Sequence, residues 1–314
     1  SDKTVTATGN NIRGKQECSM ISVIIPTLNE CKGIKQVIHG FPEDYRSHDV
    51  KLYIVDGGST DGTKEIVEDS RAELIEQRLK GGKGNGVKQG LNEVDSEIYV
   101  MIDADGTYDP EEMGRLVDPL IDGKAEHVIG RRYNRSKNAI PKLNLAGNYL
   151  FNLAVRISTD AEVSDMLSGY RAFTHFSLRH TKLTAPGFGI ETEMTLSAVE
   201  NKVPIEEVNI DYSQRKGESK LNPVSDGWRI MSTIIWGIRD INPLKFFTAA
   251  SSIFFVLATY PSYLAISGYL ANGKIVDLAP SLIASVLIII GLQMLIFGMI
   301  SDQVRRNEKR LSQG

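Results

Sequence analysis

Two long apolar blocks near the C-terminus constrain this chain more than any other feature of its sequence. They run from about Phe246 to Leu270 and from about Leu278 to Ile300, and neither contains Asp, Glu, Lys, Arg or His. As helices they reach roughly 34–38 Å each, which exceeds the hydrocarbon core of a bilayer at about 30 Å. We therefore predict two transmembrane helices within residues 246–300. The alternative, two buried helices of a soluble core, is disfavoured because such long uncharged stretches seldom lie side by side in one.

Positive charges precede the first block and follow the second, whereas the loop between the blocks has almost none. The flanking basic residues are Arg229, Arg239, Lys245, Arg305, Arg306, Lys309 and Arg310. The connecting loop carries Lys274, which Asp277 offsets. Because positively charged flanks stay in the cytoplasm, we expect a hairpin with both ends inside, a cytoplasmic basic tail at 301–314 and a cytoplasmic catalytic domain.

The segments on either side of the main domain have distinct characters. Residues 221–245 place Trp228, Ile234 and Ile238 on one apolar face, which predicts an amphipathic helix lying in the membrane interface. Residues 1–19 lack an apolar core, so they are not a signal peptide, and we expect a disordered leader.

Short apolar runs alternate with helical patterns through the first part of the chain. The predicted strands are 21–26, 50–55, 73–76 and 98–102, and the predicted helices begin near 32, 63 and 82. This alternation indicates an α/β domain with a mostly parallel sheet, which we place at residues 20–220. Such sheets bind ligands beyond the carboxyl ends of their strands.

Acidic residues follow the predicted strands at that edge. Asp103 and Asp105 come directly after 98–102, and two carboxylates so close repel each other unless a cation joins them. Hard oxygen ligands in an open site suit Mg²⁺ or Mn²⁺ bridged to substrate phosphates. Asp56 closes an earlier strand and is a candidate acceptor for a nucleobase or ribose, or a helix cap. The Gly82–Gly84 segment offers backbone N–H groups and the cation of Lys83 to phosphate, or is a plain turn.

Bulk composition excludes other classes of function. The formal net charge is −3, which gives no sign of nucleic-acid binding. The two cysteines, Cys18 and Cys31, have no spacing typical of a disulfide framework or a zinc site.

Four motifs in order give the chain a family resemblance. They read VIIPTLNE (23–30), VDGGSTDGT (55–63), GGKGNG (81–86) and DAD (103–105), and together they resemble glycosyltransferase family 2. The resemblance covers about residues 20–220 and implies the GT-A fold, a nucleotide-sugar-binding α/β domain. It implies a metal at Asp103 and Asp105. The nucleotide-sugar-binding residues that it implies are Pro26, Thr27, Asn29, Glu30, Asp56, Gly57, Ser59, Lys83, Gly84, Asp103, Ala104 and Asp105.

Four later segments resemble the polyprenyl-phosphate (dolichol-phosphate) glycosyltransferase subfamily with two C-terminal transmembrane helices. They read GRRY (130–133), DMLSGYR (165–171), FGIETE (188–193) and RKGESK (215–220). The resemblance implies inverting transfer of a sugar to dolichyl or polyprenyl phosphate, with Asp103, Asp105 and Asp165 in catalytic roles. The lipid-phosphate-binding residues that it implies are Arg132, Lys142, Arg215, Ser219 and Lys220. Whether Asp165 is a base or a positioning group stays open.

One departure from the subfamily bears on the donor. Mannose synthases usually continue the DAD motif as Leu-Gln-His-Pro, whereas here Gly106, Thr107, Tyr108 and Asp109 precede the proline. Thr107 stands where the resemblance expects a metal-assisting Gln. We therefore prefer a UDP-sugar to GDP-mannose.

Two alternatives remain at the level of the sequence. A family 2 enzyme that extends a lipid-linked glycan or polysaccharide would share the donor site but use a sugar hydroxyl as its nucleophile. An inactive membrane scaffold that keeps a nucleotide-binding fold would show no turnover of nucleotide-sugar. A homo-oligomer formed by paired hairpins is also left open.

Overall fold

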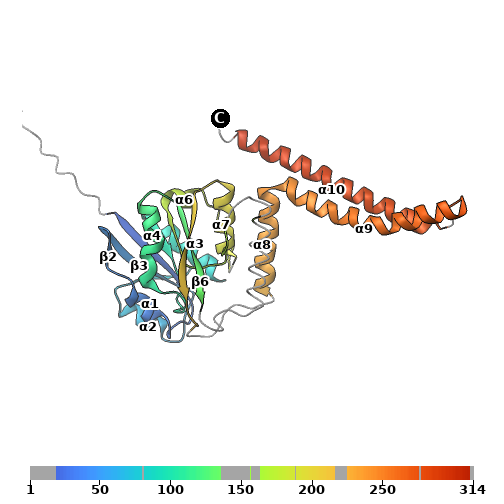
Figure 1. Ribbon diagram of the computed structural model, residues 1–314. Coiled ribbons are helices and arrows are strands. Elements are labelled where there is room, and N and C mark those ends of the chain that lie inside the picture. Colours follow the sequence, from blue (N-terminus) through green and yellow to red (C-terminus); the bar gives the residue numbers. More distant parts are fainter. Residues whose placement is uncertain are drawn as a thin grey trace, which may run out of the picture.

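A mixed α/β domain carries a long helical hairpin (Figure 1). The computed structural model describes residues 19–79, 81–135, 156, 163–187, 189–215, 225–275 and 277–311. Lys142, Ser219, Lys220 and residues 1–18 of the expected leader lie outside the described residues.

One eight-stranded sheet forms the centre of the domain. Its strands are β1 (Met20–Thr27), β2 (Asp44–Tyr45), β3 (His48–Asp56), β4 (Glu73–Glu76), β5 (Ile98–Met101), β6 (His127–Arg135), β7 (Arg171–Thr174) and β8 (Ile205–Tyr212). Their order is β2-β3-β1-β5-β7-β6-β8, with β4 paired to β3. The pairs β1–β3, β1–β5, β3–β4 and β6–β8 are parallel, whereas β7 is antiparallel to both neighbours. The predicted α/β domain with a mostly parallel sheet is confirmed. The structure also shows strands β6, β7 and β8, which the sequence analysis did not predict.

Helices cover both faces of this sheet because the strand residues alternate in direction. The helices of the domain are α1 (Ile34–Gly40), α2 (Thr63–Glu68), α3 (Lys83–Glu93), η1 (Pro110–Glu112), α4 (Met113–Ile121), α6 (His175–Arg179) and α7 (Ile190–Glu200). Val23 and Ile25 of β1 belong to the core cluster that contains residues of α1, α2 and α4. Ile24 belongs to the other cluster, with residues of α3 and α7. Three layers thus hold the ends of β1, β3 and β5 at one edge.

The helix α8 (Ser225–Ile241) connects this domain to the hairpin. Ile234 and Ile238 are buried in a third cluster together with Leu196 of α7. Gly237 lies at the crossing, where an added Cβ would lie 2.4 Å from Leu196 Cδ1 and would force that side chain to shift. Trp228 and Trp236 are 72% and 55% exposed, so Trp228 does not share the buried face of Ile234 and Ile238 as the sequence predicted. The location of α8 in a membrane interface stays a prediction.

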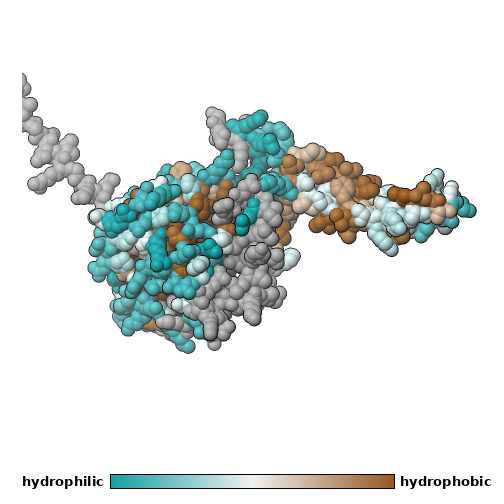
Figure 2. Space-filling view, viewed as in Figure 1, coloured by the Kyte–Doolittle hydropathy of each residue, from teal (hydrophilic) through white to brown (hydrophobic). Residues whose placement is uncertain are grey.

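The helices α9 (Pro243–Asn272) and α10 (Leu278–Leu311) pack along each other and project away from the domain (Figure 1). Both are long and apolar enough to cross a membrane, and only 11% and 17% of their most apolar windows are buried. Figure 2 shows the exposed hydrophobic side chains of this arm beside a hydrophilic domain. Core helices of a soluble protein would be mostly buried, so that alternative does not fit. The helix α10 continues beyond Ile300, which places the basic residues of the expected tail on its last turns.

A buried histidine lies at the start of β6. His127 is 1% exposed, and neither ring nitrogen has a hydrogen-bond partner among the described residues. Burial, and then the positive charge of Arg171, lowers the pKa of His127 from 6.5 to about 3. The folded protein therefore keeps this ring neutral at pH values where an unfolded chain protonates it.

We predict that His127 makes the fold sensitive to acid. Between pH 6.5 and 3 the unfolded chain binds more protons than the folded one, so stability falls as the pH falls through this window. From pH 7 to 5 the loss is about 2 kcal/mol. The variant His127→Leu should lose less thermal stability than the wild type over this range, measured in detergent. The exposed His39→Gln is the control, and an equal acid sensitivity in all three proteins would exclude His127 as the cause.

Candidate active site at the carboxyl edge of the sheet

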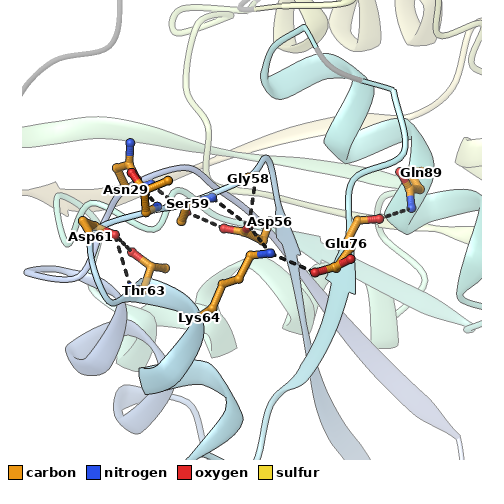
Figure 3. A network of polar contacts seen from close by, with 10 residues as sticks. Asn29, Asp56, Gly58, Ser59, Asp61, Thr63, Lys64, Glu76 and Gln89 are labelled. Atoms are coloured by element: carbon orange, nitrogen blue, oxygen red, sulfur yellow. Dashed lines mark hydrogen bonds and ion pairs between the residues drawn. The ribbon is translucent and has the colours of Figure 1, made fainter.

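The turns that follow β1 and β3 are joined by side-chain hydrogen bonds (Figure 3). The backbone N–H of Asn29 donates to Ser59 Oγ at 2.8 Å, and Asn29 Oδ1 accepts from the N–H of Thr60 at 2.8 Å. Asn29 has a φ of 50°, a left-handed conformation that Asn tolerates better than most residues. The VIIPTLNE and VDGGSTDGT motifs therefore build one rigid wall at the edge of the sheet.

Asp56 organises the second of these turns from within. Its side chain is 1% exposed and accepts from the N–H groups of Gly58 and Ser59, both at 2.9 Å, and from the Ser59 hydroxyl. Lys64 approaches the same carboxylate at 3.7 Å. The expected helix cap is not seen, because Asp56 accepts from Gly58 and Ser59 in the turn and α2 begins only after Gly62. A contact of Asp56 with a nucleobase or ribose stays a prediction.

A second acid stabilises the start of α2. Asp61 Oδ1 accepts from the N–H and hydroxyl of Thr63, and Oδ2 accepts from the N–H of Cys31 at 3.2 Å. Burial acts to raise its pKa, but these hydrogen bonds outweigh burial and hold the pKa at about 2. The first turn of the site is thus tied to α2 by a group that stays ionised.

Asp103 shares a lysine with a residue of α7. Lys83, in the first turn of α3, forms ion pairs with Asp103 and with Glu191; Glu191 is buried, and the side chain of Lys83 is 11% exposed. Gly169 lies against this pair, since a Cβ there would be 2.5 Å from Asp103 Oδ2 and 3.1 Å from Lys83 Nζ. Lys83 of the GGKGNG motif is therefore paired with Asp103 of the DAD motif.

The backbone of the same motif packs tightly instead of forming an open loop. The helix α3 begins at Lys83, and a Cβ at Gly84 would lie 2.3 Å from the carbonyl oxygen of Ala185. The N–H of Asn85 donates to the carbonyl of Pro186 at 3.1 Å. The glycine is thus explained by close approach of the 185–187 segment.

Asp105 is held on two sides. Thr107 donates to Asp105 Oδ1 from its backbone N–H at 3.0 Å and from its hydroxyl at 2.7 Å. Arg215 approaches Oδ2 at 3.2 Å and also forms an ion pair with Glu30, which follows β1. Burial, and then the charge of Asp103, raises the pKa of Asp105. Thr107, which departs from the subfamily motif, orients the carboxylate.

The charges at this edge fit a divalent cation. Among the described residues, the carboxylates of Glu30, Asp103, Asp105 and Glu191 are paired with the two cations Lys83 and Arg215, which leaves a formal charge of −2. No group of three or more His, Cys, Asp or Glu in the described part of the chain could hold a metal by itself. Asp103 and Asp105 are hard oxygen donors, and Mg²⁺ typically binds to one or two carboxylates together with substrate phosphates. The donor set therefore suits a metal that arrives with a phosphorylated ligand.

Arg132 and Asp165 form a separate pair, in which the carboxylate is buried. Arg132 donates from Nε at 2.7 Å and from Nη2 at 2.6 Å to the two oxygens of Asp165, and its backbone N–H donates at 3.1 Å. Glu207 of β8 in turn accepts from the N–H groups of Ser164 and Asp165 at 2.8 and 2.9 Å. The Asp165 side chain is 1% exposed. Its geometry is that of a group that positions a guanidinium.

The structure brings together most of the residues that the sequence singles out. Pro26, Thr27, Gly57 and Ala104 contribute backbone at this edge; the N–H of Gly57 donates to the carbonyl of Thr27 at 2.8 Å. The sequence analysis assigned no role to Glu191 or Glu207. Arg215, which the resemblance assigns to the lipid phosphate, forms ion pairs with Glu30 and Asp105 in the structure. The acidic start of α7 was a visible signal for Glu191, whereas Glu207 occurs in an ordinary strand without one.

Comparison with known proteins decides the family. Residues 22–180 match the family described as Glycosyl transferase family 2. The chain belongs to this family. A glycosyltransferase of Haloferax volcanii, AglJ, is 33% identical over 306 residues, which cover 93% of this chain and 97% of the relative. A dolichyl-phosphate hexose transferase of the same organism is 31% identical over 217 residues, or 68% of this chain and 92% of the relative.

Solved structures show the same fold. Glucosyl-3-phosphoglycerate synthase from Mycobacterium tuberculosis, in complex with Mn²⁺, UDP and glucosyl-3-phosphoglycerate, matches with a TM-score of 0.58 and 23% identity. The match covers 70% of this chain and 80% of that one. The GT-A-type fold and the activity of a glycosyltransferase expected from the motifs are thereby confirmed.

The contact of Gly169 with the DAD motif gives a test of the site. The variant Gly169→Ala should weaken Mn²⁺ binding several-fold, because the added methyl displaces Asp103, and the protein should still fold because the Asp103 side chain is 27% exposed and can move. Isothermal titration with Mn²⁺ in the presence of UDP measures the change. Gly227→Ala, where a Cβ meets nothing within 4 Å, is the control. Unchanged Mn²⁺ affinity in Gly169→Ala would show that Asp103 does not hold the metal.

Proposed function

We propose that this glycosyltransferase moves a sugar from a nucleotide-sugar to dolichyl or polyprenyl phosphate at the cytoplasmic face of a membrane. One observation carries the proposal: the acidic pair Asp103 and Asp105 and the basic residue Arg215 lie at one edge of the sheet, in a domain that leads through α8 into two apolar helices. The similarity to a dolichyl-phosphate hexose transferase over 68% of the chain supports the same acceptor. The product is a lipid-phosphate-linked monosaccharide for glycan assembly.

The donor binds against the wall formed by the turns after β1 and β3. Asn29 and Ser59 fix the shape of this wall, and Lys83 supplies a cation beside Asp103. Asp103 and Asp105 are the residues that hold Mg²⁺ or Mn²⁺. When bound, the metal neutralises charge on the leaving diphosphate. A UDP-sugar is our preferred donor, on the ground of Thr107.

The proposed acceptor, a lipid phosphate, has to be bound by the enzyme but does not need a general base to activate it. A phosphate monoester has a second pKa of about 6, so it is largely a dianion at neutral pH and already a nucleophile. The difficulty is to bring it close to an anionic donor, and arginine is suited to this because its planar fork pairs with phosphate oxygens. Arg132 and Arg215 are the described residues that we assign to the acceptor phosphate.

Asp165 then acts as a positioning residue. Arg132 donates to both of its oxygens, and the side chain is almost fully buried, which leaves it poorly placed to take a proton from a sugar hydroxyl. This weighs against the alternative of a glycan-extending enzyme, because a hydroxyl nucleophile needs a general base. A single displacement at the anomeric carbon inverts its configuration, so an α-linked donor yields a β-linked lipid phosphate.

The role of Asp105 is tested by substitution. Asp105→Ala should abolish transfer of radiolabelled sugar to polyprenyl phosphate, because the variant loses a metal ligand. The protein should keep its thermal transition, because the carboxylates at this edge outnumber the cations and Arg215 keeps Glu30 as a partner. Asp122→Ala is the matched control, since Asp122 pairs only with surface cations at 3.0 and 3.1 Å among the described contacts. Wild-type activity in Asp105→Ala would refute the assigned role.

The proposed orientation rests on charge and on one contact. Arg305, near the end of α10, lies 3.6 Å from Glu200 of α7, so α10 ends beside the catalytic domain. With the basic residues that follow the second apolar block, this favours a hairpin whose two ends share the cytoplasmic side.

Labelling of single cysteines tests this orientation. In a chain with Cys18 and Cys31 replaced by Ser, Lys274→Cys should react with a membrane-impermeant maleimide on intact cells. Asn307→Cys, at the opposite end of α10, should react only after the cells are permeabilised. The reverse pattern would place the catalytic domain outside, and labelling of both on intact cells would contradict a spanning hairpin.

A further inference from the structure

Arg215 lies at the entrance of a group of buried acids. It follows β8 and reaches across to the ends of β1 and β5, where it contacts Glu30 and Asp105. The side chain of Arg215 is 27% exposed, whereas those of Glu30 and Asp105 are 7% and 10% exposed. The guanidinium is therefore the outer, more accessible partner of two buried acids.

Arg215 and a metal compete for the same carboxylate. Thr107 already donates twice to Oδ1 of Asp105, so the oxygen that faces a ligand is Oδ2, which Arg215 contacts at 3.2 Å. A divalent cation on that oxygen would be in direct contact distance of the guanidinium charge and would repel it. Metal and Arg215 cannot both occupy this position.

The contacts of Arg215 are also incomplete, unlike those of the neighbouring cations. Its Nε is buried without a hydrogen-bond partner among the described residues, which is unfavourable for a strong donor. Arg132, by contrast, is held bidentately by Asp165. Lys83 lies between two carboxylates and in the first turn of a helix. Arg215 is thus the cation at this site whose present partners are easiest to exchange for a phosphate.

We propose that Arg215 alternates between two partners during the reaction. Without donor it neutralises Glu30 and Asp105; once a divalent cation has bound to Asp105 with the nucleotide-sugar, Arg215 is displaced and becomes available to the acceptor phosphate. The donor therefore binds before the acceptor, and Arg215 reports occupation of the donor site to the acceptor site. This inference rests on the proposed function, because the second partner is the acceptor phosphate.

The first experiment measures the affinity of the whole chain, in detergent, for Mn²⁺ in the presence of UDP. Arg215→Gln should bind Mn²⁺ at least five-fold more tightly than the wild type, because the competing charge is removed. Arg215→Lys, which keeps the charge, should stay within two-fold of the wild type. Arg115→Gln is the control, since Arg115 pairs with Glu112 at the surface and is 60% exposed. Equal or weaker binding of Mn²⁺ to Arg215→Gln would overturn the exchange.

The second experiment measures binding of polyprenyl phosphate with and without Mn²⁺ and UDP. The wild type should bind the lipid at least several-fold more tightly when both are present, and Arg215→Gln should lose this enhancement. An affinity of the wild type that does not respond to Mn²⁺ and UDP would also overturn the exchange. The proposed exchange and the proposed function can be contradicted independently. The Mn²⁺ measurement contains no acceptor, so its result stands even if no sugar is transferred to polyprenyl phosphate. Mn²⁺ binding that is unchanged in Arg215→Gln, together with normal transfer by the wild type, would contradict the exchange alone.

Discussion

The concentration of carboxylates at one edge of the sheet is the constraint on which the rest of the site depends. Charged groups that leave water must be paired, because their desolvation is costly. Glu30, the Asp103–Asp105 pair and Glu191 come from three distant parts of the chain, and these four carboxylates share Lys83 and Arg215. The shortage of positive charge explains why the edge suits a metal and why Arg215, which we assign to the acceptor phosphate, pairs with Glu30 and Asp105.

The same edge is connected to the membrane by packed helices. Glu191 lies in the first turn of α7, and α8 packs along α7, with Thr233 Oγ1 only 3.1 Å from where a Cβ of Gly189 would lie. The helix α8 leads into α9, and Arg305 of α10 returns to Glu200 at the other end of α7. The helix α7, which carries Glu191, is therefore connected through α8 to the start of the hairpin and contacts the end of α10 directly.

Local patterns predicted the elements well, since hydrophobic periodicity and turn residues act over a few positions. The apolar runs near Ile24 and Val100 became β1 and β5, and the uncharged blocks became α9 and α10. The pairings were beyond reach, because they join residues far apart in sequence. The sequence around Arg215 does not predict its contact with Glu30, which lies 185 positions away. Only the folded chain shows that Arg132 donates to both oxygens of Asp165. A motif marks a residue as important, but the tertiary fold decides its partner.

The nature of the acceptor is tested most directly by the mass of the product. The purified chain would be incubated with Mn²⁺, a panel of UDP- and GDP-sugars, and equal amounts of polyprenyl phosphate and a polyprenyl-diphosphate-linked sugar. Our account predicts a new lipid with the mass of polyprenyl phosphate plus one sugar residue. Sugar added only to the lipid-linked sugar would contradict it and would favour a glycan-extending enzyme.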